Sequence, residues 1–243
     1  RVMPLLEVER VTKMFGGRAA VRDLSFGVER GEIVGIIGPN GAGKTTTFEI
    51  ITGFQVPTEG RVRFKGESLA GLRPYEAARR GLGRTFQIPQ PFPSFTVLEN
   101  IMAAAFMHHA SRGAAEGKAR AVLERVGMAS SAGFLAKNLT LADTKRLEIA
   151  RALAIDAEMV LLDEVMAGLT PVEADEAIAL VLSLNRGGVT FLVIEHIMQI
   201  IMSISQRIVV LHHGEKIAEG TPDHVSQDSK VIEAYLGEEG FLA

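Results

Sequence analysis

A run of nine residues has the composition and spacing of a phosphate-binding loop. It reads Gly38-Pro39-Asn40-Gly41-Ala42-Gly43-Lys44-Thr45-Thr46, with four residues between the first glycine and the Gly-Lys-Thr triplet. Glycines let the main chain wrap closely around an anion, and successive N–H groups at the start of a helix attract it. We expect Lys44 to bridge the β- and γ-phosphates of a nucleotide and Thr45 to offer its hydroxyl to Mg²⁺.

The residues on either side of this loop suit that interpretation. The apolar residues 33–37 are typical of a buried parallel strand, and residues 46–51 are typical of a helix that ends near Gly53. A strand, a glycine-rich loop and a helix, in this order, form the context in which the spacing indicates phosphate binding. The alternative, a glycine-rich turn that binds nothing, is disfavoured because all of these parts are in place together with the Lys-Thr pair.

Two carboxylates follow another apolar run. Residues 159–162 suit a buried strand, and Asp163 and Glu164 come directly after it. Ligands of a parallel sheet bind beyond the carboxyl ends of its strands. We therefore expect Asp163 to hold Mg²⁺ through water, and Glu164 to accept a proton from the attacking water or simply to orient it. The alternative for this pair is an acidic N-cap of the next helix.

An imidazole and an amide complete the candidate catalytic set. His196 lies at the tip of another apolar strand, where it is expected to hydrogen-bond a γ-phosphate oxygen and the attacking water. Gln87 lies where the predicted α/β sequence passes into a helical block, and its neutral amide can reach Mg²⁺ or the attacking water. The alternatives are a surface or capping histidine and an ordinary loop glutamine.

The remaining aromatic candidates have weaker signals. Phe15, beside a pair of glycines, has the shape to stack on adenine or to pack as an ordinary turn aromatic. The adjacent pairs His108-His109 and His212-His213 are expected to point in different directions and to be solvated.

Composition describes a globular chain without a strong charge bias. The 243 residues are 47% hydrophobic and 23% charged, and the net charge of −3 provides no global basic field that would favour nucleic acid. The absence of cysteine excludes disulfides and thiolate metal sites and suits a reducing compartment. No apolar run approaches the roughly 18 residues that span a bilayer, and we expect no secretory signal.

The order of the predicted elements indicates an α/β fold with a helical insertion. We expect strands at residues 5–11, 24–28, 33–37, 61–64, 159–162, 189–194 and 207–211, and helices at residues 46–51, 74–80, 97–109, 114–126, 141–153, 172–184 and 197–203. Their alternation favours a mostly parallel sheet covered by helices on both faces. Residues 81–93, rich in Gly and Pro, are expected to be irregular. Residues 87–154 have little strand signal and are interpreted as an insertion into a core made of residues 1–86 and 155–243.

These motifs, in this order, resemble the ATP-binding cassette (ABC) family of ATPases over essentially the whole chain. Phe15 matches the aromatic residue that stacks on adenine, residues 38–46 the Walker A loop, Gln87 the Q-loop, Asp163-Glu164 the end of Walker B, residues 167–171 the D-loop and His196 the switch histidine. More narrowly, segments 83–87, 96–100, 146–153, 194–196 and 234–237 are similar to one ATPase subunit of bacterial branched-chain amino-acid importers. That subfamily also handles other amino acids, amides and urea.

The resemblance implies a fold, an activity and cofactors. The expected fold is a P-loop NTPase core with a mostly parallel sheet, an N-terminal antiparallel β-subdomain and an inserted α-helical subdomain. The expected activity is hydrolysis of ATP, with Mg²⁺, to power a membrane importer. The alternative is a soluble ABC-type ATPase scaffold, as in iron–sulfur cluster assembly. An ATPase of nucleic-acid maintenance is disfavoured because the 87–154 block is too short for the long insertions of such relatives.

The resemblance also implies partners and a location. A second ABC ATPase subunit, identical or different, is expected to pair head to tail with this one. Transmembrane permease subunits and, indirectly, a solute-binding protein complete the expected assembly, which places the chain peripherally on the cytoplasmic face of the bacterial inner membrane; no nucleic acid is expected. The loop from Gln87 to about Asn100 is expected to contact the permease, with Phe92 and Phe95 as an apolar docking patch or, alternatively, a small local core.

One segment departs from the family pattern. The ABC signature normally reads Leu-Ser-x-Gly-Gln, whereas residues 139–143 read Leu-Thr-Leu-Ala-Asp. The resemblance implies that Thr140 keeps a hydroxyl for the γ-phosphate bound by the opposite subunit, with Ala142 at the glycine position. Alanine there costs about 1–2 kcal/mol if the backbone needs a positive φ, and nothing if the position merely opens a helix. Asp143 brings negative charge near phosphate, so one of the two composite sites is expected to be weak or degenerate.

Overall fold

The computed structural model describes residues 3–236 and divides the chain into two units. Unit 1 combines residues 1–77 with residues 190–243, and unit 2 comprises residues 78–189. The sequence-based boundaries of the helical insertion, 87–154, remain a prediction. Helices α3, α4 and α5 lie inside that range, whereas strands β6 and β7 and helix α6 cluster with them in unit 2. Among the described residues, none of the helices has the length and apolar character needed to cross a bilayer.

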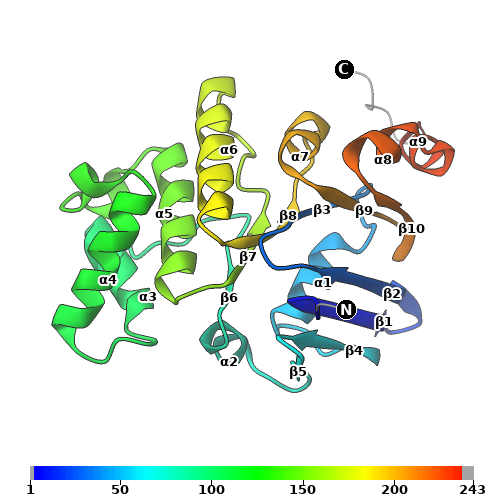
Figure 1. Ribbon diagram of the computed structural model, residues 1–243, viewed down its shortest axis with the longest axis horizontal. Coiled ribbons are helices and arrows are strands. Elements are labelled where there is room, and N and C mark those ends of the chain that lie inside the picture. The colour runs from blue at the N-terminus through cyan, green and yellow to red at the C-terminus, as the bar shows by residue number, and fades with distance from the viewer. Residues whose placement is uncertain (1–2, 237–243) are drawn as a thin grey trace. The chain divides into compact units, whose positions relative to one another are not determined.

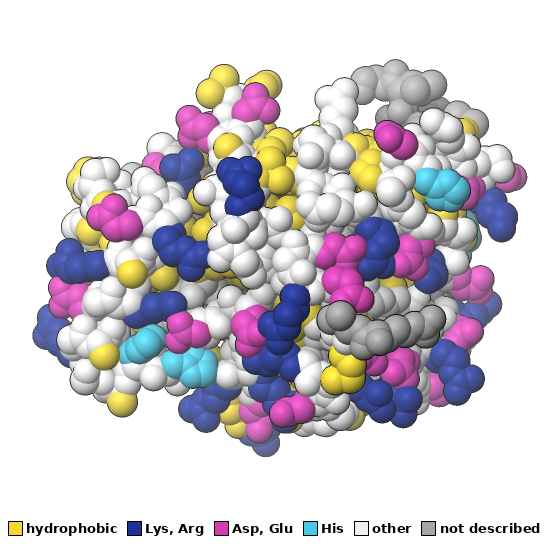
Figure 2. Space-filling model, viewed as in Figure 1, with side chains coloured by type: hydrophobic (Ala, Val, Ile, Leu, Met, Phe, Trp, Pro, Cys, Tyr) yellow, Lys and Arg dark blue, Asp and Glu magenta, His cyan; other side chains and the backbone are white. Residues whose placement is uncertain are grey.

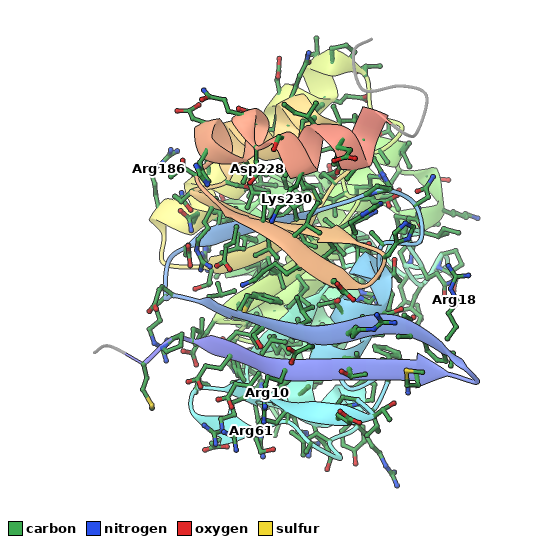
Figure 3. The ribbon with its side chains drawn as sticks, turned by 90° about the vertical axis from the view of Figure 1, so that its right-hand side faces the viewer. Arg10, Arg18, Arg61, Arg186, Asp228 and Lys230 are labelled. Atoms are coloured by element: carbon green, nitrogen blue, oxygen red, sulfur yellow. The ribbon has the colours of Figure 1, made fainter. Side chains whose placement is uncertain are left out.

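An antiparallel sheet forms the first part of unit 1. Its strands, in spatial order, are β2 (Arg18–Val28), β1 (Leu6–Phe15), β4 (Glu59–Phe64) and β5 (Glu67–Ser68). One face is apolar, with Leu6, Val8 and Val11 of β1 buried. The other carries charged pairs such as Arg61 with Glu9, 2.6 Å apart. Figure 3 shows Arg10 and Arg61 on this sheet, on neighbouring strands β1 and β4.

Parallel strands form the second part of unit 1. Strand β3 (Ile33–Ile37) lies between β8 (Thr190–Ile194) and β9 (Arg207–His212), and both are parallel to it. Every residue of β3 and β8 is buried, which explains why both read as continuous apolar runs rather than alternating ones. The short strand β10 (Glu215–Gly220) pairs with β9 in an antiparallel hairpin.

Four helices belong to this part of unit 1. They are α1 (Lys44–Ile51), α7 (Met198–Ile204), α8 (Pro222–Gln227) and α9 (Ser229–Leu236). Helices α8 and α9 pack over the β9–β10 hairpin, as Figure 3 shows. Arg207 on β9 pairs with Glu32 at 2.8 Å and also with Glu219 on β10. The hydrogen bonds and charge of Glu32, and then of Glu219, raise the pKa of Arg207 despite its partial burial.

Unit 2 consists of two parallel strands and a set of helices (Figure 1). Its elements are β6 (Leu82–Arg84), α3 (Val97–Ala105), α4 (Arg112–Arg125), α5 (Leu141–Ala154), β7 (Met159–Asp163) and α6 (Pro171–Arg186). Helix α3 packs against α4 and α5. Capping boxes start α3 at Thr96 and α6 at Thr170, because Glu99 and Glu173 return a hydrogen bond to the cap residue. Helix α2 (Pro74–Arg79) spans the division between the units.

Strand β6 corrects the expectation that residues 81–93 are irregular. Residues 82–84 pair with 159–161 in parallel register. The strand was hidden because it is only three residues long and has a glycine at its centre. Close packing favours glycine at this position, because a Cβ on Gly83 would lie 3.0 Å from the Ala152 carbonyl oxygen of α5. The elements β5, β10, α8 and α9 were also missed.

Charged side chains of both signs are interspersed over the face in Figure 2. Many form exposed pairs, such as Arg120 with Glu116 one helical turn away, at 2.7 Å. Exposed pairs of this kind each contribute little to stability, so packing within each unit matters more.

Candidate nucleotide-binding site

The phosphate-binding loop joins β3 to α1 and lies entirely in unit 1. Two of its glycines cannot be replaced without a clash. Gly38 has φ 154° and Gly43 has φ 101°; a Cβ on Gly38 would lie 2.1 Å from the Leu211 oxygen, and one on Gly43 would lie 2.5 Å from the Ala20 oxygen. Neighbouring strands therefore press on the outside of the loop, which fixes the path of its main chain around the helix start.

The start of α1 is built to receive an anion. Gly43 is its N-cap and provides no side-chain cap, and the first turn contains no acidic residue. The positive end of the helix dipole and its first N–H groups are thus not neutralised by a carboxylate of the same turn. Lys44 is only 6% exposed, and its Nζ donates to the carbonyl oxygens of Gly38 at 2.6 Å and Pro39 at 3.0 Å. The ammonium group is therefore anchored inside the loop.

His196 lies at the same edge of the parallel strands as this loop. Ile36 of β3 is paired with Ile194 of β8 in parallel register. Gly38 lies two residues after Ile36 and His196 lies two residues after Ile194, so both follow the same paired position. The His196 side chain is exposed, whereas the preceding Glu195 is 3% exposed. The loop and the imidazole predicted to act on one phosphate thus share one end of neighbouring strands within unit 1.

Phe15 ends β1, and its ring is 47% exposed. The Lys13 ammonium lies 5.0 Å from the ring centroid, which is a cation–π geometry. An exposed ring with an available face suits stacking on a base, whereas a packed turn aromatic would be buried. Its role toward adenine remains a prediction.

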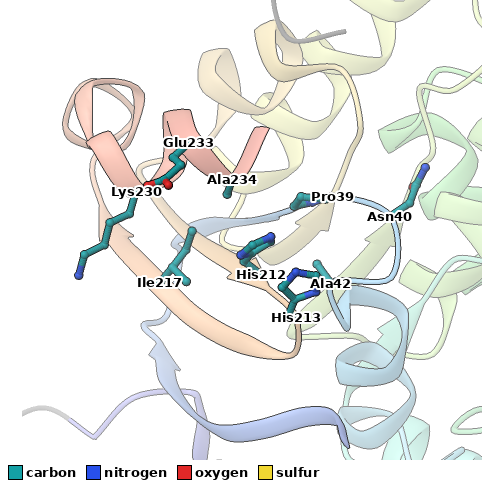
Figure 4. Close-up of a pocket in the computed structure, with 9 residues that line it drawn as sticks. All are labelled: Pro39, Asn40, Ala42, His212, His213, Ile217, Lys230, Glu233 and Ala234. Atoms are coloured by element: carbon teal, nitrogen blue, oxygen red, sulfur yellow. The ribbon is translucent and has the colours of Figure 1, made fainter. Parts of the chain in front are cut away.

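A pocket of about 640 Å³ lies on the flank of the loop (Figure 4). The phosphate loop, the β9–β10 hairpin and helix α9 line it, with the residues Pro39, Asn40, Ala42, His212, His213, Ile217, Lys230, Glu233 and Ala234. Phe15 is not among these residues, so the pocket is not the predicted position of the base.

The pair His212-His213 does not behave as expected. The two rings lie together, with centroids 4.0 Å apart and planes tilted by 40°, instead of pointing in different directions (Figure 4). The reason is local backbone geometry: His213 has φ 48° in the turn between β9 and β10, which rotates its side chain away from strand alternation.

The carboxylates occupy the end of β7 in unit 2. Asp163 is buried, and its Oδ2 pairs with Arg84 at 3.0 Å, with the two side chains 7% and 9% exposed. The Thr85 hydroxyl accepts a hydrogen bond from the Asp163 main-chain nitrogen at 3.1 Å. Arg84, at the end of β6, therefore holds the carboxylate predicted to serve Mg²⁺, and Thr85, the next residue, holds the main chain of Asp163.

Gln87 and Glu164 contact each other directly. The Gln87 Nε2 donates to the Glu164 Oε2 at 2.6 Å. Glu164 also has φ 51°, a left-handed backbone that residues with a Cβ adopt rarely and that is concentrated at functional sites. The amide predicted to reach Mg²⁺ or the attacking water thus touches the carboxylate predicted to accept a proton from that water or to orient it.

The segment that resembles the signature starts helix α5. Thr140 is the N-cap, its hydroxyl oxygen accepts from the Asp143 main-chain nitrogen at 3.1 Å, and the same hydroxyl donates to the Asp143 carboxylate at 2.9 Å. Ala142 lies inside the helix and is not among the described residues with a positive φ. Of the two alternatives for Ala142, the helical one holds, so its backbone carries no strain.

The residues predicted to hold Mg²⁺ have suitable donor atoms. Thr45 is exposed at the start of α1 in unit 1, and Gln87 and Asp163 belong to unit 2. They offer hydroxyl, amide and carboxylate oxygens, the hard ligands that Mg²⁺ prefers. Gln87 uses its nitrogen toward Glu164, so its oxygen is not the atom engaged in that bond. Residues 3–236 contain no cluster of three or more His, Cys, Asp or Glu side chains that would hold a metal ion by themselves.

Two positions escaped the sequence analysis. Arg84 lies in segment 83–87, which resembles the family, but no sequence pattern marks it as the partner of Asp163. Lys145, in the second turn of α5, is 6% exposed and donates to the Glu164 carbonyl at 3.1 Å. In the sequence, the position of Lys145 does not differ from that of a lysine on the exposed face of a helix.

Comparison with known proteins agrees with the motifs and the fold. The family model described as "ABC transporter" matches residues 21–167, and the one described as "Branched-chain amino acid ATP-binding cassette transporter" matches residues 215–240. The chain therefore belongs to the ABC transporter family, as its resemblance predicted. It is 40% identical to the high-affinity branched-chain amino acid transport ATP-binding proteins BraF of Pseudomonas aeruginosa and LivG of Salmonella typhimurium, covering 97% of this chain and 98% of each relative.

Solved structures extend the match to three dimensions. A nucleotide-free ATP-binding cassette from an ABC transporter superposes with a TM-score of 0.88 at 34% identity, covering 97% of this chain and all of the other. The ADP conformation of an ATP-binding cassette gives 0.88 at 35% identity, with 98% and 100% covered. A dimeric bacterial ABC transporter cassette gives 0.79 at 27% identity, with 89% and 98% covered. These likenesses confirm the predicted fold class, and nothing in them favours the soluble scaffold.

Proposed function

We propose that this chain is the ATP-binding and ATP-hydrolysing subunit of a membrane importer for branched-chain or related amino acids. The observation that carries this proposal is the nearly full-length identity of 40% to two branched-chain amino acid transport ATP-binding proteins. The separate match of residues 215–240 to a branched-chain transporter family supports it from the C-terminal segment.

In this proposal, unit 1 binds the triphosphate. The N–H groups at the start of α1 and the Lys44 ammonium receive the β- and γ-phosphates, and Phe15 stacks on adenine. The uncapped, acid-free helix start and the buried lysine support this assignment. His196, at the same edge of the strands, hydrogen-bonds the γ-phosphate.

Unit 2 provides the hydrolytic groups. Glu164 acts as the base toward water and is held by Gln87. Asp163 and Gln87 would hold Mg²⁺ together with Thr45 of unit 1. When bound, Mg²⁺ neutralises charge on the phosphate oxygens. The carboxylate–amide contact of 2.6 Å and the strained backbone of Glu164 support this role.

Two such chains, or this chain and a different ATPase, pair head to tail around ATP. The dimeric structure of a bacterial ABC transporter cassette supports the pairing of two cassettes. The nucleotide then contacts Walker A of one subunit and the start of α5 of the other, at Thr140 and Ala142. ATP stabilises the closed pair because it contacts both halves, and hydrolysis removes that contact. Asp143 carries a negative charge in the first turn of α5, and its carboxylate accepts a hydrogen bond from the Thr140 hydroxyl. In a pair with a different ATPase, we therefore assign the weaker of the two composite sites to the one that contains this start of α5.

Permease subunits dock on the loop after Gln87. Phe92 and Phe95 are 45% and 44% exposed, with ring centroids 5.2 Å apart, and Ile88 is 73% exposed. Asn100 fixes the loop by donating to the carbonyl oxygens of Phe92 and Thr96 and accepting from the Phe92 nitrogen. A rigid loop that presents apolar side chains suits a protein partner. The chain thus lies peripherally on the cytoplasmic face of the membrane and serves a solute-binding protein indirectly.

Copurification and transport test this proposal. A tagged chain, expressed with the permease genes of its own genome and extracted in mild detergent, is expected to retain those permeases. In vesicles, the complex with a solute-binding protein should couple ATP hydrolysis to uptake of leucine, isoleucine or valine. Retention of soluble partners alone, or hydrolysis that no amino acid of a full panel stimulates, would contradict the importer.

A further inference from the structure

Lys145 is a buried lysine that bonds to the backbone around Glu164. It lies in the second turn of α5 and is only 6% exposed. Its Nζ donates to the main-chain oxygen of Glu164 at 3.1 Å and to that of Ala167. Burial of an ammonium group costs free energy, and hydrogen bonds to the two carbonyl oxygens offset part of this cost.

The backbone that Lys145 binds is in an unfavourable conformation. Glu164 has φ 51°, although it carries a Cβ. Such residues persist only where the surrounding structure holds them. The Glu164 oxygen also accepts from the Ala167 nitrogen at 3.2 Å, so Lys145 and the turn share one acceptor. The side chain of Glu164 is fixed separately, by Gln87.

Further contacts join the start of α5 to the same loop. A Cβ on Gly168 would lie 3.3 Å from the Leu141 side chain, which shows that the first turn of α5 packs against this part of the loop. Arg146, beside Lys145, pairs with Glu176 of α6 at 3.1 Å. Residues 164–168 are therefore held against α5, with Lys145 as the buried link to Glu164.

We propose that Lys145 is a positioning residue for ATP hydrolysis: by binding the Glu164 carbonyl, it keeps the Glu164 backbone left-handed and aims the carboxylate at the attacking water. This inference rests on the proposed function, in which Glu164 is the base. Without the ammonium group, the Glu164 backbone relaxes and the carboxylate leaves its productive orientation, while the phosphate loop of unit 1 is unaffected.

The test compares variants at position 145 in the full chain. Lys145→Met keeps the length of the side chain but removes its donors, and Lys145→Arg restores them. Lys118→Met is the matched control, because Lys118 also bonds a unit 2 acceptor, Asp156, which lies outside residues 164–168. Steady-state hydrolysis gives kcat and KM, and calorimetry with a non-hydrolysable ATP analogue gives affinity.

We expect Lys145→Met to lower kcat by about tenfold to a hundredfold, as misplaced catalytic groups do. The affinity for the analogue and the KM should change by less than about twofold, because the interactions that bind the ground state and the transition state equally are unchanged. Lys145→Arg should recover most of kcat, and Lys118→Met should match the wild type. If Lys145→Met does not fold by circular dichroism, Lys145→Gln is measured and judged by the same criteria.

A double-mutant cycle with Glu164→Gln separates positioning from a general structural effect. If Lys145 acts through Glu164, Lys145→Met lowers the residual rate of the Glu164→Gln variant no further. Three results would each overturn the inference: a loss of kcat in the double variant equal to the product of the two single losses, a wild-type kcat in the Lys145 variant, or a loss confined to nucleotide affinity. Normal turnover by Glu164→Gln alone would instead overturn the proposed catalytic role of Glu164.

Discussion

The Arg84–Asp163 ion pair offers a quantitative test of how unit 2 holds the carboxylate proposed to bind Mg²⁺. Arg84→Met removes the guanidinium and keeps an apolar side chain of comparable length. The two side chains are 9% and 7% exposed, and the atoms of the pair are 3.0 Å apart. After this change, the buried Asp163 carboxylate loses its charge partner.

The expected loss of stability follows from burial. Breaking a buried ion pair by removing one partner costs about 3–5 kcal/mol, because the other charge stays out of water. For a chain of this size, that loss corresponds to about 6–20 °C in Tm. Loss of the stacking of Arg84 on Phe86, at 5.2 Å, acts in the same direction. Replacing both partners, as in Arg84→Met with Asp163→Leu, should recover most of the loss, since no buried charge remains.

Equilibrium urea unfolding, followed by circular dichroism at pH 7, measures these differences. Arg120→Met is the control, because its pair with Glu116 is exposed and should contribute about 0.3–0.5 kcal/mol. If Arg84→Met costs no more than this control, or if the double variant is less stable than Arg84→Met, the reasoning from a buried carboxylate that has lost the Arg84 guanidinium is refuted.

Three further predictions concern the loop, the signature and pH. Gly43→Ala should weaken ATP binding by about five- to 150-fold in calorimetry, since a Cβ would lie 2.5 Å from the Ala20 oxygen and strain of this kind costs about 1–3 kcal/mol; unchanged affinity would show that the loop adapts. Asp143→Asn should raise the ATPase rate about two- to fivefold, because a charge at an exposed helix start is worth about 0.3–1 kcal/mol; a lower rate would show that the carboxylate is needed. Burial opposes ionisation of Asp156, but the hydrogen bond and charge of Lys118, with His109 and His108, outweigh it and lower its pKa below 3.8. A carboxyl group whose pKa is lower in the folded chain than in the unfolded chain stabilises the fold at pH values above its unfolded pKa, and this stabilisation is lost as pH falls through the folded pKa. Lys118→Met should therefore lower the free energy of unfolding at pH 7, and should lower it progressively less below pH 3.8, in urea titrations; a difference independent of pH would exclude this linkage.

Much of the site was predictable because its motifs are local. The glycine spacing between an apolar strand and a helix predicts the phosphate loop. The positions of Asp163 and His196 after apolar runs predict that both lie at strand ends. Parallel strands buried on both faces read as continuous apolar runs, so β3, β7 and β8 were anticipated nearly to the residue.

The rest depends on contacts between distant segments. Strand β6 is stabilised by pairing with β7, some 77 positions along the chain, and three residues carry too little periodicity to reveal it. The partners of Asp163 and Glu164, namely Arg84 and Lys145, are ordinary residues in the sequence and acquire meaning only when the fold buries them. The stacking of His212 on His213 likewise depends on one positive φ that no propensity scale predicts.

The central proposal is that Lys44 binds the nucleotide whose hydrolysis Glu164 catalyses. A crystal structure of the Glu164→Gln variant with Mg-ATP tests it most directly. The account predicts one ATP whose γ-phosphate accepts a hydrogen bond from the Lys44 Nζ, with the side chain at position 164 beside the water in line for attack. ATP bound at Lys44 with position 164 remote from its γ-phosphate would contradict the account.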